Sequence, residues 1–207
     1  MAEDLGKKTF REKLKLLFPL IDNLRRMLAA ARHAFNRHSR AELAKIAKLQ
    51  DDFTLDIDPF FEWVEKELET GPAAGKADLL KFQQVLSNLE LMAREISGLA
   101  EPIRRKGNHG AILSDKDVVL VNNLFSQQEG FLRVLVDIFT YNDAGLKAYV
   151  VNECRKIRDA SFRDEADHEF RMMDSPGQPD AWSIHIEILE HFREGLKHLI
   201  ALVEALD

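Results

Sequence analysis

The chain has 207 residues, of which 45% are hydrophobic and 31% are charged, so it can bury a core and is too apolar to be disordered. Its net charge of −6 argues against a nucleic-acid role that depends on a strongly basic surface. The single cysteine, Cys154, excludes an intramolecular disulfide and a thiolate zinc cage, and it suits a reducing cytosol. No apolar run approaches the roughly 20 residues that span a bilayer, and the N-terminal segment lacks a signal-peptide pattern. We therefore expect a cytoplasmic protein.

The first predicted helix covers about residues 9–36, where apolar residues recur at spacings of three and four. Pro19 lies inside this pattern and cannot donate a backbone hydrogen bond. We therefore expect either a kink or a loose first segment before a helix that begins near Phe18.

The second predicted helix covers about residues 40–69. Ser39 and Glu42 have the capping-box spacing, in which the serine hydroxyl and the glutamate satisfy free backbone groups at a helix start. Pro59, in the interior of this helix, predicts a bend. The third predicted helix covers about residues 76–105 and is followed by a polar loop.

The second half of the chain begins with the same kind of signal. Ser114, with Asp117 three residues later, marks the start of a fourth helix that should run to about Tyr141. Asn142 or Asp143 then caps a fifth helix.

The fifth predicted helix covers about residues 144–173 and has a thin apolar stripe, whereas the sixth, over 182–205, has a regular apolar face. A shift of 103 positions lays the third helix on the sixth, and a shift of 104 lays the first on the fourth. We therefore predict an all-α fold, a six-helix bundle made of two tandem three-helix repeats at about 9–106 and 113–207 within one domain, 1–207.

Several motifs near the end of the chain are similar to those of a known family. They are His168-Glu-Phe-Arg171, Asp174-Ser175-Pro176-Gly177, Ile186-Glu-Ile-Leu189-Glu-His-Phe-Arg193 and His198-Leu199. Together with the two tandem three-helix halves, they resemble the PhoU family of phosphate-uptake regulators, in particular the PhoU-like domains that accompany sodium/phosphate cotransporter-type permeases.

The resemblance implies a cytoplasmic, non-enzymatic regulator or adaptor of phosphate uptake. It would act by contact with a phosphate permease or an associated signalling protein, with peripheral contact at the membrane and no membrane span. The family is often dimeric, so a homodimer is compatible with this interpretation. Two alternatives stay open: a metal-binding helical bundle of the di-iron carboxylate type, and a structural helical protein of unknown partner.

The family's characteristic metal motif is an acidic residue followed four positions later by Asp, on the third helix of each half. Carboxylates at that spacing share one helical face and can hold a hard cation or iron. The corresponding pairs here are Glu90 with Arg94, and Arg193 with Lys197. Cationic side chains offer no lone pair to a metal, so these bases weaken the expectation of a divalent-metal or iron cofactor.

Two other clusters are candidate metal ligands. Asp52 and Asp56 keep the spacing of four on the second helix. Asp164, Asp167 and His168 belong to an acidic cluster on the fifth helix that contains one Glu-x-x-His spacing, whereas di-iron bundles use that motif twice. A solvated charged face is the simpler interpretation of both clusters.

Glu101 and Glu204 occupy equivalent positions of the two repeats. We hypothesise that they pair with Arg94, Arg193 or Lys197 and so replace metal ligation by salt bridges.

Overall fold

The computed structural model describes the backbone of residues 5–6, 8–71, 75–174 and 179–207, and the side chains of these residues except 164–174 and 179. In chain order the helices are α2 (Phe10–Lys15), α3 (Phe18–Arg37), α4 (Arg40–Thr70), α5 (Lys76–Gly98), α6 (Ala100–Asn108), α7 (Asp115–Tyr141), α8 (Ala144–Asp174) and α9 (Pro179–Glu204). The described residues contain no strand, so the predicted all-α bundle is confirmed.

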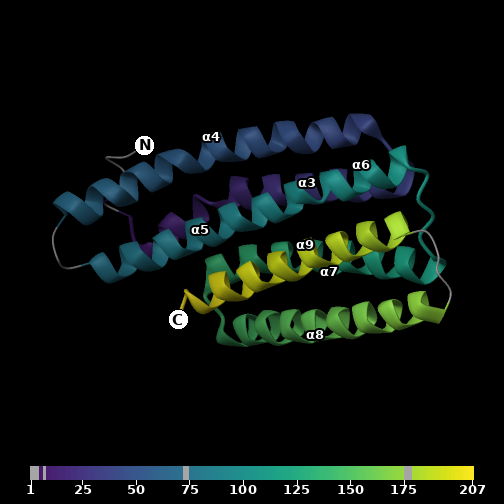
Figure 1. Ribbon diagram of the computed structural model, residues 1–207. Coiled ribbons are helices and arrows are strands. Elements are labelled where there is room, and N and C mark those ends of the chain that lie inside the picture. The colour runs from purple at the N-terminus through teal and green to yellow at the C-terminus, as the bar shows by residue number, and fades with distance from the viewer. Residues whose placement is uncertain (1–4, 7, 72–74, 175–178) are drawn as a thin grey trace.

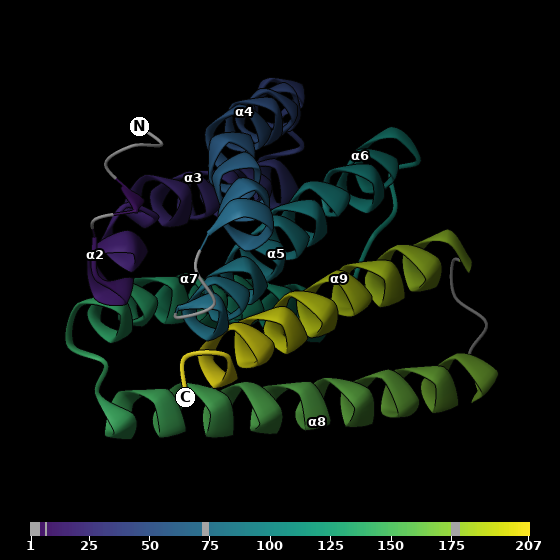
Figure 2. The same ribbon diagram turned by 90° about the vertical axis from the view of Figure 1, so that its left-hand side faces the viewer.

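The long helices lie side by side in an elongated bundle (Figure 1). α4 and α8 lie at opposite edges, and α5, α7 and α9 lie between them (Figures 1 and 2). α4 packs against α3 and α5, and α8 packs against α9 and α7. We call helices α2–α6 and helices α7–α9 the two sides of the bundle. The two sides meet where α5 contacts α9 and where α3 contacts α7. Within the described residues, no helix combines the length and the apolar character that crossing a membrane requires.

The core is continuous across this meeting surface. Phe35 of α3, Phe125 of α7 and Phe192 of α9 are each about 1% exposed. The ring centroids of Phe35 and Phe125 are 6.1 Å apart, and those of Phe125 and Phe192 are 4.9 Å apart at an interplanar angle of 86°. Edge-to-face packing of this kind stabilises a core beyond the area that it buries.

The first predicted helix is divided as expected. α2 ends at Lys15, and α3 begins at Phe18 with Pro19 in its first turn. A continuous helix would need the absent N–H of Pro19 to bond the carbonyl of Lys15, four residues earlier, so the chain turns at this point instead.

The third predicted helix is also divided, which the sequence analysis did not anticipate. α5 ends at Gly98, and α6 starts at Ala100. Pro102 lies four residues after Gly98 and has no N–H to bond its carbonyl, so a proline accompanies this division as well. Pro59, by contrast, lies within the uninterrupted helix α4.

The junctions of α3 with α4 and of α7 with α8 share one backbone plan. His38 and Asn142, which are 104 positions apart, both adopt the left-handed conformation, with φ of 51° and 53°. The hydroxyl of Ser39 accepts the N–H of Glu42 at 3.3 Å, and the Asp143 carboxylate accepts the N–H three residues later at 2.7 Å. The repeat boundaries themselves stay a prediction, which these matched junctions support.

The predicted start of the fourth helix is confirmed in detail. Ser114 caps α7 by accepting the N–H of Asp117 at 3.2 Å, and its own hydroxyl donates to the Asp117 carboxylate at 2.6 Å. The first of these bonds satisfies one of the backbone donors that every helix start leaves unpaired.

Candidate functional site

The positions that match the family's metal motif lie on α5 and α9, where the two sides of the bundle meet. Arg94 pairs with Glu90 at 3.6 Å, and Lys197 donates to Glu194 at 2.6 Å. Both are short-range pairs within one helix, at spacings of four and three, and both are largely solvent-exposed. Exposed pairs of this kind contribute at most about 1 kcal/mol each.

Arg193, the remaining motif position, is nearly buried, with 6% of its surface exposed. Its guanidinium carbon lies 4.5 Å from the centre of the Phe162 ring of α8. A guanidinium over an aromatic face is attracted by the ring quadrupole. Arg193 therefore links α9 to α8, and it lies at a pocket that Glu95 and Glu194 also line.

A histidine and a glutamate connect α5 to α9 beside these motif positions. His191 Nδ1 lies 2.8 Å from a carboxylate oxygen of Glu95. Gly98 allows this close approach, since a Cβ there would lie 2.3 Å from His191 Cε1. The sequence did not reveal this pair because its members are far apart along the chain. The glycine in an otherwise helical segment was the available signal.

The residues at the motif positions do not fit a metal. Arg94 and Lys197 bring positive charge, and their neighbouring carboxylates Glu90 and Glu194 are already paired with them. Within the described side chains, no group of three or more His, Cys, Asp or Glu residues is arranged to hold a metal ion.

The predicted partners of Glu101 and Glu204 are wrong. Glu101 accepts Arg104 Nε at 3.0 Å, and Glu204 accepts a guanidinium N–H of Arg155 at 2.6 Å. Arg94 and Lys197 pair within their own helices instead. The two glutamates lie near the ends of their helices, away from the motif positions, so neither ion pair substitutes for a metal site there.

Asp52 and Asp56 are brought together at one pocket of about 330 Å³ between α3 and α4. Asp22 and Arg26 of α3 also line it. The arginine lies among the acids and reduces the attraction of this pocket for a cation. Metal binding by Asp52 and Asp56 stays a prediction.

The second predicted cluster lies on α8. The side chains of Asp164, Asp167 and His168 lie outside the described residues, so their role also stays a prediction.

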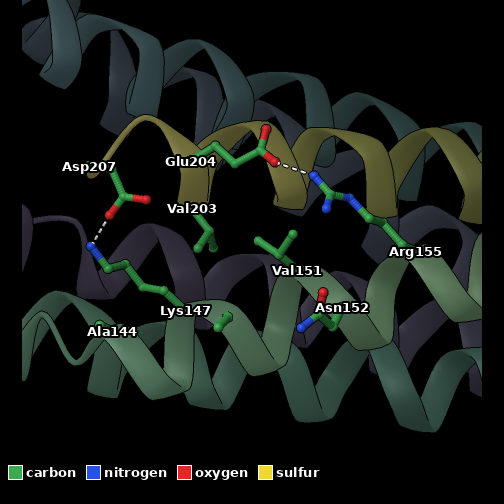
Figure 3. A pocket seen from close by; sticks show the side chains of 9 residues that line it. Ala144, Lys147, Val151, Asn152, Arg155, Val203, Glu204 and Asp207 are labelled. Atoms are coloured by element: carbon green, nitrogen blue, oxygen red, sulfur yellow. Dashed lines mark hydrogen bonds and ion pairs between the residues drawn. The ribbon is translucent and has the colours of Figure 1, made fainter.

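A pocket of about 290 Å³ lies between α8 and the end of α9 (Figure 3). Lys147 and Arg155 point from α8 toward the acids of the opposite segment (Figure 3). Lys147 pairs with Asp207, and Arg155 pairs with Glu204. Each cation therefore has an anionic partner. We call this cavity the second-half pocket.

A second pocket, of about 160 Å³, lies near the junction of α3 with α4, where α4 starts beside α6. It is lined by His38, Arg40, Leu43, Ile103, Arg104, Gly107 and Asn108. We call it the first-half pocket. The sequence reasoning missed it because α4 and α6 come together only in the folded chain.

Among the described residues, the shifted pKa values do not indicate a catalytic nucleophile. Burial raises the pKa of the Cys154 thiol to about 12, so the thiol stays protonated at neutral pH. Burial also lowers the pKa of His198, against the opposing attraction of Glu194 and Glu95. Both shifts follow from desolvation, which disfavours the charged form of each group.

Comparison with solved structures identifies the fold. The chain superposes on PhoU from Pseudomonas aeruginosa with a TM-score of 0.79 and 17% identity, covering 94% of both chains. It superposes on the phosphate transport system regulatory protein PhoU from Streptococcus pneumoniae with a TM-score of 0.80 and 13% identity, covering 96% of this chain and 95% of that one. No family model and no curated protein matches the sequence. The likeness extends over nearly the whole length of all three chains, and the chain therefore has the PhoU-like fold.

Proposed function

We propose that this protein is a non-enzymatic cytoplasmic regulator of phosphate uptake that acts by contact with a phosphate permease or its signalling partner. The observation that carries the proposal is the match of the whole bundle to two PhoU proteins, one of them a phosphate transport system regulatory protein. The regulatory role is proposed from this shared fold, because the sequence identities are 17% and 13%.

Two features of the molecule support a contact role over chemistry. The cavities described above are small, and the cations of the second-half pocket are already paired with acids. The one cysteine is buried, with a raised pKa, so it offers no thiolate. A rigid bundle of long helices can instead present one extended face to a membrane protein.

A deletion strain tests the proposal. We expect the loss of the gene to raise uptake of radiolabelled phosphate under phosphate excess, and a plasmid copy to restore the lower rate. Affinity purification of the tagged full chain from detergent-solubilised cells should recover a phosphate permease or its signalling partner. Unchanged uptake together with no such partner would overturn the proposal.

A further inference from the structure

Cationic and hydrogen-bonding side chains line the small first-half pocket. Arg40 and Arg104 line it from two different helices, and His38 and Asn108 lie on its wall. No acidic residue is among the described side chains that line it. A cavity of about 160 Å³ admits a small ligand rather than a large cofactor.

The positive charge at this pocket exceeds the negative charge beside it. The guanidinium of Arg104 is paired with Glu101, whose carboxylate accepts a hydrogen bond from Nε at 3.0 Å. Arg40 makes no hydrogen bond or ion pair to any side chain in the described part of the chain. Arg40 is also the first residue of α4, a helix of 31 residues, and the N-terminal end of a helix carries partial positive charge. One arginine therefore remains available to an anion.

Lys106 reinforces the charge from behind the pocket. It is 8% exposed, and its Nζ donates to the Phe35 carbonyl at the end of α3 at 3.2 Å. The same nitrogen lies 3.5 Å from His38 Nε2, and its charge lowers the pKa of His38. The lowered pKa of His38 indicates a positive potential at the wall of the pocket.

The second-half pocket has a different distribution of charge from the first-half pocket. Shifts of 104 and 103 positions place Ala144 where the first half has Arg40, and Asp207 where it has Arg104. Lys147 and Arg155 there are each paired with an acid. Of these two pockets, only the first-half pocket contains a cation, Arg40, without an acidic partner among the described side chains.

We propose that the first-half pocket binds a phosphate-type oxyanion, either inorganic phosphate or a phosphate monoester, between Arg40 and Arg104. Guanidinium groups donate paired N–H bonds that match phosphate oxygens, and the amide of Asn108 supplies a further donor. The site goes beyond the proposed function, because binding by the purified chain does not require contact with a transporter.

Isothermal titration calorimetry of the purified full chain with inorganic phosphate, in low-chloride buffer, tests the site. We expect one site per chain and at least about tenfold weaker binding by Arg40→Gln and by Arg104→Gln. Arg155→Gln is the matched control, since it removes one arginine from the second-half pocket and should bind phosphate like the unaltered protein. Thermal melting followed by circular dichroism confirms that each variant is folded.

Separate titrations with inorganic phosphate and with glycerol phosphate distinguish the two sources of the ligand. Binding of both supports recognition of the phosphate group itself, and binding of only one assigns the site to that source. An absence of heat with both ligands would overturn the proposal. Equal weakening by Arg155→Gln and Arg40→Gln would also overturn it, because binding would then follow net charge rather than this pocket.

Discussion

The first-half and second-half pockets each lie beside the start of one helix and the end of another, at positions that the predicted repeat makes equivalent. Their backbones begin alike, because His38 and Asn142 share the left-handed conformation and the next residue caps the following helix. Their charges differ, since the second-half pocket pairs each cation with an acid and the first-half pocket leaves Arg40 unpaired within the described chain. The comparison shows that one helical plan can carry two different surface chemistries, because exposed side chains near helix ends contribute little to the fold.

The largest expected effect on stability comes from Gly98, a position at which the two predicted repeats have different residues. A Cβ at this position would lie 2.3 Å from His191 Cε1, whereas the position 103 residues later is Ala201. We expect Gly98→Ala to lower the free energy of unfolding by about 1–3 kcal/mol, because the histidine must leave its place against Glu95. Urea denaturation measures the change.

Gly130→Ala is the matched control for that substitution. Gly130 lies in the interior of α7, and a Cβ there meets nothing within 4 Å. Alanine should stabilise the helix by about 0.5–1 kcal/mol. Equal effects at Gly98 and Gly130 would contradict the close approach of α5 and α9.

The helix caps test whether the two junctions are energetically equivalent. Ser39→Ala and Asp143→Ala each remove a side-chain acceptor from the first turn of α4 or α8. Each should cost about 1 kcal/mol of unfolding free energy. A large loss at one junction and none at the other would show that the shared backbone geometry does not reflect a shared role.

The smallest expected effects concern the repeat-equivalent glutamates. Glu101 and Glu204 are 53% and 50% exposed and pair with Arg104 and Arg155. Glu101→Gln and Glu204→Gln should each change stability by less than about 0.5 kcal/mol. Differential scanning calorimetry at low and high salt checks this, and a loss above about 2 kcal/mol would show that these pairs hold the bundle together.

Local signals accounted for much of the fold before any tertiary contact was known. Ser39, Ser114 and Asp143 cap the helices that were expected to follow them, because capping depends on residues within one turn. The division of the third helix coincides with Pro102, but a proline alone does not predict a break, since Pro59 lies within the uninterrupted helix α4.

The candidate sites were less predictable, because they depend on the packing of distant helices. The equivalent positions of Glu101 and Glu204 in the two repeats suggested that they pair with the cations at the motif positions. In the folded chain they pair with Arg104 and Arg155 instead. Arg40 and Arg104 both line the first-half pocket. Helical periodicity could not predict this, because the two residues lie on different helices.

The positive charge beside the first-half pocket makes the stability of the fold depend on pH through His38. The neighbouring Lys106 lowers the pKa of His38 in the folded chain. The unfolded chain therefore binds more protons in the window between the lowered pKa and the ordinary pKa of histidine. The contribution of His38 to stability is present above the ordinary pKa and is lost as the pH falls through the lowered one.

The most direct test of the charge difference between the pockets is an NMR titration of the His38 ring. We predict that its pKa lies below the ordinary value for histidine, rises in Lys106→Met, and rises in the unaltered protein when inorganic phosphate is added. A His38 pKa that is ordinary and unmoved by either change would contradict the account.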